Sequence, residues 1–259
     1  MSHLPYTHVK VCRRASTNPK HFATFKQQPE FIKILEHVSP KTGRQYASLI
    51  KKRYPRILQK LNWESIQTND KYGGASVCDY RDVFGKLPNT THARFSPTTL
   101  RYAYQAIDAL VKFPGKQLTI IEIGGGYGGL CKVIHDVAPV IGKEVTSYTL
   151  IDLPEPVSLQ EKYLSHWELS DLKFISFSSN MTSRLDDKYD LLVSNYALGE
   201  LNRWTQDIYA DQVVKRCATY YVTWNTKDVH PIFATAKTLP EEPKTGRHNL
   251  LLTKFTCHV

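Results

Sequence analysis

The stretch IIEIGGGYGGL, residues 120–130, joins an apolar run to a turn that contains five glycines. Its first residues have the composition of a buried β-strand, and residues 130–137 continue with the pattern of a helix. Glycine is required where a backbone turns tightly or where a ligand approaches it without meeting a Cβ atom. A strand, a glycine-rich turn and a helix in this order are typical of α/β proteins that bind nucleoside cofactors.

The spacing of these glycines fits two different cofactor motifs. Gly124, Gly126 and Gly129 match G-x-G-x-x-G, the dinucleotide motif. Glu122, Gly124, Gly126 and Gly128 match E-x-G-x-G-x-G, the first motif of S-adenosylmethionine-dependent methyltransferases. The glycines alone therefore leave both cofactors open.

The residues after the turn alternate between strand patterns and helix patterns. Helices are predicted between most of the strands, at 130–137, 157–165 and 205–217. Strands separated by single helices form parallel βαβ units, so we predict an open doubly wound sheet with its ligand at the switch point of the strand order. The predicted strands are 118–123, 147–151, 173–177, 190–194, 220–224 and 249–255.

The beginning of the chain carries helical patterns on a basic background. Residues 1–28 show no sustained periodicity, so we predict an irregular segment there. A helical pattern begins at Phe31 and is interrupted by Pro40, and a second, basic helix is predicted over 46–61.

A further helix is predicted directly before the glycine turn. Ser96 and Pro97 have the residue types of a helix start, and the helix continues to about Phe113. We therefore divide the chain into a basic, mainly helical N-terminal segment, residues 1–66, and a main domain, residues 67–259.

Positive charge is concentrated in the first sixty residues. Residues 1–60 hold 13 Lys and Arg against 2 Asp and Glu, whereas the rest of the chain holds 21 against 22. The net charge of +10 therefore comes from the N-terminal segment. Such a segment suits a glycosyltransferase partner, an acidic surface or nucleic acid, and a solvated helical face explains it equally well.

Cysteine usage and hydropathy exclude several classes of protein. The five cysteines form no CxxC pair, so neither a disulfide framework nor a cysteine zinc site is predicted. No apolar run approaches the roughly 18 residues that cross a bilayer. The first residues also have no apolar core of signal-peptide length. We therefore expect a cytoplasmic protein with no transmembrane segment.

Polar residues at the predicted strand ends help to decide between a dinucleotide and S-adenosylmethionine as the cofactor. Glu122 ends the first strand, where a carboxylate suits the cationic methionine end of S-adenosylmethionine better than a pyrophosphate. Asp152 ends the second strand and can accept hydrogen bonds from both ribose hydroxyls of either cofactor. After the third strand, Asn180 and Met181 offer a polar group and an apolar shelf where adenine would lie.

The fourth predicted strand leads into SNYALGEL, residues 194–201. The sequence contains no N/D-P-P-Y, the usual motif of amino-group methylation, which argues against methylation of nucleic-acid bases. Glu200 lies just beyond this strand, so we predict that it is the general base or orients the acceptor hydroxyl. His230 and His248 are the alternative bases, and no essential metal ion is expected.

Several segments in the same order resemble a known family. EIGGGYGGL (122–130), YTLIDLPEPVSLQEKYL (148–164) and YDLLVSNYALGEL (189–201) are similar to the sugar O-methyltransferase family. NDKYGG (69–74) and SPTTLRYAYQAI (96–107) resemble the same family, so that the resemblance covers residues 68–259. It implies a Rossmann-like class I methyltransferase that binds S-adenosylmethionine and methylates a hydroxyl of a sugar, a hexose or deoxyhexose of a glycan.

The resemblance also implies which residues line the site. It gives Tyr102, together with Arg101, a contact to the acceptor or to the methionine end, and the residues themselves offer the aromatic faces of Tyr196 and Trp204 for binding the acceptor sugar. The residues expected to bind the cofactor are Glu122, Gly124, Gly125, Gly126, Tyr127, Asp152, Leu153, Asn180, Met181, Asn195 and Arg101.

Two other activities remain open at this point. The basic segment would suit an RNA methyltransferase, whose affinity for a polyanion falls steeply with salt. The glycine turn would also suit an NAD-dependent dehydrogenase, which nicotinamide binding would distinguish.

Overall fold

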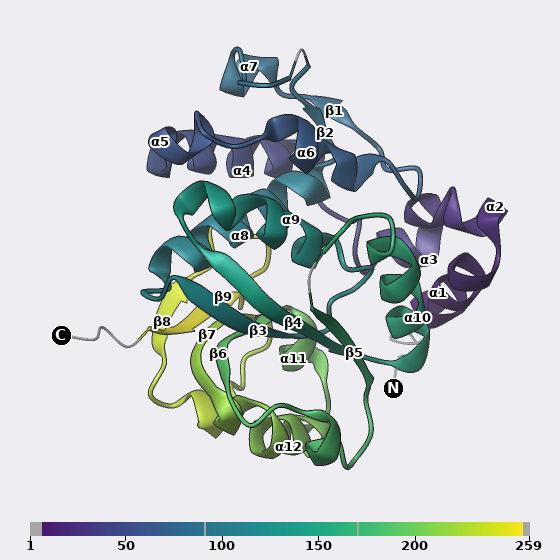
Figure 1. The fold of residues 1–259 in the computed structure, drawn as a ribbon, viewed down its shortest axis with the longest axis vertical. Coiled ribbons are helices and arrows are strands. Elements are labelled where there is room, and N and C mark those ends of the chain that lie inside the picture. The colour runs from purple at the N-terminus through teal and green to yellow at the C-terminus, as the bar shows by residue number, and fades with distance from the viewer. Residues whose placement is uncertain (1–6, 91, 170, 256–259) are drawn as a thin grey trace. The chain divides into compact units, whose positions relative to one another are not determined.

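A computed structural model describes residues 7–90, 92–169 and 171–255 (Figure 1). The chain forms two compact units. Within the described residues, unit 1 comprises 7–110, 126–142 and 155–169, and unit 2 comprises 111–125, 143–154 and 171–255. Unit 1 runs across residue 66, and the predicted division of the chain at that position stays a prediction.

Unit 2 is built on a seven-stranded, mostly parallel sheet. In spatial order the strands are β5-β4-β3-β6-β7-β9-β8; the first five are parallel, and β9 is antiparallel to both β7 and β8. This arrangement confirms the predicted α/β class and the doubly wound, Rossmann-like sheet. The strands are β3 (Gln117–Ile123), β4 (Glu144–Asp152), β5 (Leu172–Ser176), β6 (Tyr189–Asn195), β7 (Cys217–Trp224), β8 (Lys237–Pro240) and β9 (Leu250–Lys254).

A side-chain clasp joins the two central strands of this sheet. The Asp190 carboxylate of β6 accepts hydrogen bonds from the Thr119 amide of β3 at 2.7 Å and from its hydroxyl at 2.8 Å. The Asp190 amide donates in return to the Thr119 hydroxyl at 3.0 Å. Since a slip of one residue would turn every side chain to the other face, this clasp helps to set the register of β3 against β6.

Two helices of unit 2 follow β6 along the chain. They are α11 (Ala197–Glu200) and α12 (Arg203–Gln212), and the Asn202 side chain caps α12 by accepting from the Thr205 amide at 2.9 Å. The predicted helix over 205–217 was wrong at its end, because α12 stops at Gln212 and Cys217 already begins β7. β8 was not predicted, since its sequence KTLP has no alternating apolar pattern.

Unit 1 is mainly helical. It also holds a two-stranded antiparallel sheet of β1 (Cys78–Asp79) and β2 (Arg94–Phe95). Among the described residues, no helix combines the length and hydropathy needed to cross a membrane. The helices that lie wholly or mainly in unit 1 are α1 (Thr7–Thr17), α2 (Pro19–Phe22), α3 (Pro29–Ile32), α4 (Pro40–Arg53), α5 (Pro55–Leu58), α6 (Trp63–Gln67), α7 (Arg81–Phe84), α8 (Pro97–Lys112), α9 (Gly129–Val137) and α10 (Pro154–Leu164).

Prolines begin helices in this unit. Pro19, Pro29, Pro40 and Pro55 each occupy the first position of a helix, where the missing amide hydrogen has no helical partner to lose. The prediction of an irregular segment over 1–28 was therefore wrong for residues 7–22, which form α1 and α2; residues 1–6 lie outside the described part.

The predicted helix over 46–61 was also wrong as a single element. Pro55 divides it into α4 and α5, since proline disfavours helical backbone at the residue before it. The helix predicted from Ser96 is confirmed as α8, and Ser96 accepts a hydrogen bond from the Thr99 amide at 3.0 Å.

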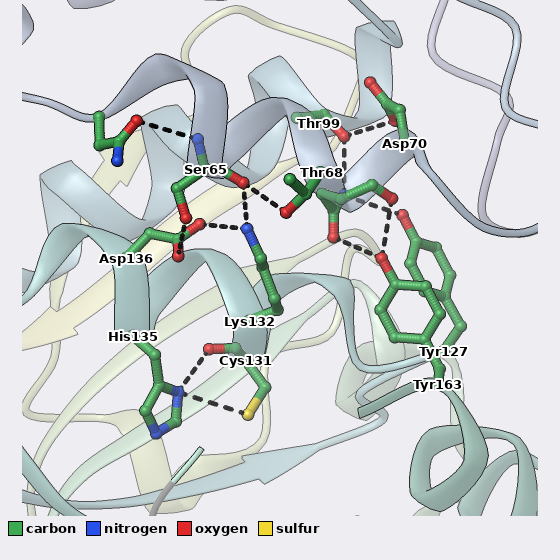
Figure 2. A network of polar contacts seen from close by, with 12 residues as sticks. Ser65, Thr68, Asp70, Thr99, Tyr127, Cys131, Lys132, His135, Asp136 and Tyr163 are labelled. Carbon is green, nitrogen blue, oxygen red and sulfur yellow. Dashed lines mark hydrogen bonds and ion pairs between the residues drawn. The ribbon is translucent and has the colours of Figure 1, made fainter. Parts of the chain in front are cut away.

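A buried polar network lies inside unit 1 (Figure 2). Lys132 of α9 is 1 % exposed, and its ammonium group donates to Asp136 at 2.6 Å and to the backbone carbonyl of Ser65. Asp136 also accepts from the Ser65 hydroxyl at 2.9 Å. A buried charge is tolerated when it is paired and its remaining hydrogen-bonding capacity is used, so this trio fastens α9 to α6.

We predict that Lys132→Ala lowers the free energy of unfolding by about 3–5 kcal/mol, because it leaves the Asp136 carboxylate without its buried counter-charge. The double variant Lys132→Met with Asp136→Leu should recover most of this loss, since no charge is then left unpaired. Urea unfolding followed by circular dichroism measures both. A single variant as stable as the parent would show that the pair contributes nothing.

Candidate functional site

The strand order of unit 2 reverses between β3 and β6. The chain passes from β3 to β4 and β5 in one direction and then returns to β6 on the other side of β3. In open α/β sheets, ligands bind beyond the carboxyl ends of the strands at such a switch point. The residues that end the parallel strands are Ile123, Asp152, Ser176, Asn195 and Trp224.

Gly124 lies at the centre of this edge. Its φ is +75°, its amide donates to the Ile151 carbonyl at 2.9 Å, and a Cβ atom built on it would overlap the Cβ of Ala197, the first residue of α11. Any side chain at this position would therefore both strain the backbone and push α11 away. Glycine is required here for close approach, as the sequence predicted for the turn.

Glu122 is a buried carboxyl group next to the turn. It is 3 % exposed and accepts a hydrogen bond from the Tyr148 hydroxyl at 2.8 Å. Burial raises the pKa of Glu122 to about 7; the Tyr148 hydrogen bond lowers it, and the negative charge of Asp152 raises it. A cationic group bound beside Glu122 would favour the ionised carboxylate, whereas an anionic group would be repelled by it.

Asp152 ends β4 and is half-buried. Its carboxylate accepts a hydrogen bond from the Leu153 amide at 2.8 Å, which orients the side chain. Burial, followed by the charge of Asp152, raises the pKa of Tyr209, so this phenol lies in the field of the carboxylate. Phe177, directly after β5, packs on Tyr209 with ring centroids 5.1 Å apart. These two aromatic residues were missed as site residues, although Phe177 ends the third predicted strand.

The residues predicted to lie near adenine have different environments. Asn180 is exposed. Met181 is fully buried in the apolar core of unit 2 together with Ile175 and Leu185, and its amide donates to Gln212 at 2.7 Å. The Met181 side chain is thus a packing residue in this structure, and its predicted contact with adenine stays a prediction.

A polar cluster lies beyond β6 and β7. Asn195 accepts a hydrogen bond from the Thr223 hydroxyl at 2.8 Å, and Asn225 donates to the Glu200 carboxylate. Burial raises the pKa of Glu200, and the Asn225 hydrogen bond lowers it. Among the described residues, the amide nitrogen of Asn195 and the amide oxygen of Asn225 are buried without a hydrogen-bond partner. Such atoms are costly unless a ligand or water pairs with them.

Tyr196 follows β6 with a strained backbone. Its φ is +66°, which costs a bulky residue about 1–3 kcal/mol and persists only where the surroundings enforce it. Its amide donates to the Thr223 carbonyl at 2.9 Å, and its hydroxyl donates to the Glu241 carboxylate. Glu241 was not singled out by the sequence, because it lies 45 residues further along the chain.

Three further residues of unit 2 were predicted to bind the acceptor or to act as a base: Trp204, His230 and His248. Trp204, on α12, is 63 % exposed. Both ring nitrogens of His230 are engaged: Nε2 lies 2.9 Å from Asp207, and Nδ1 accepts from the Ile232 amide at 3.0 Å. This pairing gives His230 a capping role. His248 lies half-buried in the connection between β8 and β9.

Unit 1 holds the rest of the predicted residues. Gly126 has a φ of +60°, and a Cβ atom on it would lie 2.9 Å from the Leu35 side chain. Arg101 is buried and donates to the Leu35 carbonyl at 3.0 Å. The Tyr127 ring is fully buried, with the Tyr102 ring 6.0 Å from it, centroid to centroid. The Tyr127 side chain is thus part of the core, so only the backbone of this residue could contact a ligand.

Two buried charges of unit 1 were missed by the sequence. The Lys26 ammonium lies 4.2 Å from the centroid of the Tyr127 ring and donates to the Asn69 carbonyl at 2.8 Å. Burial lowers the pKa of Lys26 and raises that of Glu36, and the attraction between the two groups opposes both shifts. Asn69 and Tyr127 both belong to the glycine-containing motifs, but no local pattern indicated that Lys26 reaches them.

Comparisons with known proteins were made at the levels of sequence and structure. No protein-family model matches the sequence, and the search of curated proteins also found no match. Among solved structures, the chain is similar to a SAM dependent methyltransferase from Aquifex aeolicus, at 13% identity over 57% of this chain and 87% of that chain, with a TM-score of 0.43.

Two further solved structures are similar to the chain. One is the ribosomal protein L11 methylase from Lactobacillus delbrueckii subsp. bulgaricus, at 16% identity over 60% of this chain and 78% of that chain, with a TM-score of 0.43. The other is TrmK of M. capricolum in complex with S-adenosyl-homocysteine, at 11% identity over 60% of this chain and 70% of that chain, with a TM-score of 0.41. The fold class given above rests on the order and directions of the strands.

We predict that Gly124→Ala destabilises the protein by more than the strain of its backbone alone. Gly142 is the matched control, because its φ is +72° but a Cβ atom there meets nothing within 4 Å. Gly142→Ala should lose about 1 kcal/mol, and Gly124→Ala at least about 2 kcal/mol, because of the overlap with Ala197. Adding Ala197→Gly to Gly124→Ala should recover the extra loss of stability, as measured by thermal unfolding. Equal losses for Gly124→Ala and Gly142→Ala would contradict the close approach.

The raised pKa of Glu122 predicts a pH dependence of stability. The folded protein holds this proton up to about pH 7, whereas the unfolded chain releases it near pH 4.5. The stabilising contribution is therefore complete below pH 4.5 and lost as the pH rises through 7, by about 3 kcal/mol in total. Urea unfolding between pH 5 and pH 8 should show this loss in the parent relative to Glu122→Gln. A constant difference between the two proteins would refute it.

Proposed function

We propose that this chain is an S-adenosylmethionine-dependent O-methyltransferase that methylates a hydroxyl group of a sugar, a hexose or deoxyhexose of a glycan. The observation that carries the proposal is the buried Glu122 carboxyl at the switch point, beside a glycine that no other residue can replace without overlap. The resemblance of several segments to sugar O-methyltransferases supports the choice of acceptor.

The residues of unit 2 fit this cofactor better than a dinucleotide. Glu122 and Asp152 place two carboxyl groups at the same sheet edge, and each raises the cost of holding a pyrophosphate there. A ligand with positive charge at one end and ribose hydroxyls at the other would instead pair with both. The bare backbone of Gly124 and Gly125 leaves room for it.

When bound, S-adenosylmethionine supplies a methyl group already activated by a positively charged sulfur. The residues of this chain then have to hold the acceptor oxygen in line with that group and to remove its proton. Such positioning is worth an effective molarity of about 10⁵ M or more. Asp152 would orient the ribose, and Glu122 would hold the cationic methionine end.

Glu200 is the base that we propose for the acceptor hydroxyl. Glu200 is exposed, and the partial burial of its carboxyl group raises its pKa, which makes the carboxylate a better proton acceptor. Asn225 orients the carboxylate, and the amide nitrogen of Asn195 has a free donor for a sugar oxygen. The predicted contacts of Gly126, Arg101 and Tyr102 stay part of the proposal.

Calorimetric titration with S-adenosylhomocysteine tests the cofactor directly. We expect micromolar binding by the parent and loss of about 1.5–3 kcal/mol of binding free energy in Asp152→Ala, which removes charge-assisted hydrogen bonds to the ribose. NAD is the control ligand and should not bind. Binding of NAD without binding of S-adenosylhomocysteine would overturn the proposal.

The role of Glu200 predicts a loss of turnover. Glu200→Gln keeps an oxygen for Asn225 but cannot take a proton, so kcat should fall about 10²–10⁴-fold without a change in S-adenosylhomocysteine affinity. Asp228→Asn, an exposed carboxylate beyond β7, is the matched control. Retention of full kcat by Glu200→Gln at all pH values would exclude the role of base.

An RNA acceptor is the second candidate, favoured by one surface feature. Residues 37–63 contain seven Lys and Arg and no Asp or Glu. All seven are exposed. Among the described residues, no ion pair or hydrogen bond is recorded for the side chains of four of them: Lys41, Lys52, Arg56 and Lys60. Steep, salt-sensitive binding of RNA together with its methylation would favour this acceptor over a sugar.

A further inference from the structure

The outward side of α4 in unit 1 is a line of exposed polar and basic residues. The buried side of this helix consists of Gly43, Tyr46, Ala47 and Ile50. Because an α-helix has about 3.6 residues per turn, the positions four, seven and eleven residues after Lys41 lie with it along the opposite side. These positions are Gln45, Ser48 and Lys52, and all four residues of the line are exposed.

The basic residues at the two flanks of α4 have structural roles. On one flank, Arg44 pairs with Asp82 of α7 at 2.9 Å, and Lys51 donates to a backbone carbonyl of α7 at 2.7 Å. On the other flank, Arg53 donates to the Tyr104 hydroxyl of α8 at 2.8 Å. These flanking contacts fasten α4 to its neighbours, and they do not involve the residues of the outward line.

Four basic residues of α4, α5 and the turn after α5 have no such structural role. They are the exposed residues Lys41, Lys52, Arg56 and Lys60, for whose side chains no ion pair or hydrogen bond is recorded among the described residues. Residues 37–63 contain no Asp or Glu that could neutralise them. Four unpaired charges of one sign on a stretch without acids favour an anionic partner.

Neutral hydrogen-bonding side chains lie among these charges. Gln45 and Ser48 separate Lys41 from Lys52 on α4, and no hydrogen bond is recorded for either of their side chains among the described residues. An amide or hydroxyl side chain both donates and accepts hydrogen bonds, as does the hydroxyl group of a sugar. The outward side of α4 thus combines groups that pair with anions and groups that pair with hydroxyls.

The aromatic residues of this stretch point away from solvent. Tyr46 and Trp63 are buried, and the half-buried Tyr54 donates its hydroxyl proton to Asp108. No Phe, Tyr or Trp is therefore exposed within residues 37–63, all of which the structure describes. Proteins that bind single-stranded nucleic acid stack the bases on exposed aromatic side chains. An anionic sugar chain consequently fits this surface better than RNA.

We propose that this surface binds an acidic glycan, a chain of sugars that carry anionic groups. The basic face, as we call it, consists of Lys41, Gln45, Ser48, Lys52, Arg56 and Lys60. Its cations pair with the anionic groups, and its amide and hydroxyl side chains bind sugar hydroxyls between them. The choice of a glycan rests on the proposed function, to which it adds a substrate class: the acceptor sugar belongs to a polyanionic chain.

Calorimetric titration with polymers of defined charge tests this inference. The probes are oligogalacturonate and dextran sulfate, with neutral dextran as the control for charge and polyglutamate as the control for hydroxyl groups. We expect the parent to bind at least one acidic glycan more tightly than polyglutamate of equal charge and not to bind dextran. This affinity should weaken between about 0.1 M and about 1 M salt, because the Debye length falls from about 10 Å to about 3 Å.

A charge variant tests the cations of the basic face. It combines Lys41→Gln, Lys52→Gln, Arg56→Gln and Lys60→Gln. Its affinity for the acidic glycan should fall about 10–100-fold, because four modest ion pairs are lost together. The matched control removes three Lys and one Arg from exposed positions outside the basic face by combining Lys116→Gln, Lys188→Gln, Lys244→Gln and Arg247→Gln. The control has the same net charge as the charge variant and should bind as the parent does.

A second variant tests the contacts to sugar hydroxyls. Gln45→Ala combined with Ser48→Ala should weaken binding of the acidic glycan about 3–10-fold and leave binding of polyglutamate unchanged, because only hydrogen bonds to hydroxyls are removed. Alanine is the best helix former, so the exposed face of α4 should tolerate both changes. Equal glycan affinity in this variant and the parent would overturn the choice of a glycan.

The remaining outcomes separate this inference from the proposed function. Absence of glycan binding, or equal affinity in the parent and the charge variant, overturns the inference and leaves the proposed function standing. Tighter binding of an RNA oligonucleotide of equal charge also overturns it and favours the RNA acceptor. The titrations need no cofactor. If S-adenosylhomocysteine does not bind but the charge variant loses the glycan, the proposed function falls and the basic face remains a glycan-binding surface.

Discussion

The close approach of Gly124 to Ala197 is the constraint on which the site of unit 2 depends. It brings the end of β3 against the start of α11, which follows β6, so that the two strands at the switch point finish within contact of each other. The clasp between Thr119 and Asp190 holds the same strands in register further back. Together they place Glu122 and Asn195 at one edge of the sheet.

Buried carboxyl groups recur at this edge, each controlled by a hydroxyl group. Glu122 accepts from Tyr148, and Glu241 accepts from Tyr196 and Thr245. The first pair leaves an acid whose pKa of about 7 allows either charge state near neutrality. In the second pair the carboxylate fixes the direction of the phenol. In both places a donating hydroxyl group fixes the orientation of a buried carboxyl group.

Local signals predicted the sheet well and the N-terminal helices poorly. The five parallel strands were found because buried β-strands concentrate apolar residues. Helices α1 and α2 were missed because residues 1–28 show no sustained periodicity, although Asn18 caps the helix that Pro19 begins. Pro55 was overlooked inside a longer apolar stripe and divides α4 from α5. A proline directly after a capping residue therefore indicates the start of a helix, not an irregular segment.

The sequence by itself determined the α/β class, the glycine turn and the acids Glu122 and Asp152 at the strand ends, since these follow from neighbours along the chain. Only the tertiary structure decided that Met181 and Tyr127 have core side chains and that both nitrogens of His230 are engaged. It also decided that Glu241 reaches Tyr196. Pairing over 45 residues depends on the antiparallel return of β8 and β9 to the sheet, and no local periodicity records where such a connection will place its side chains.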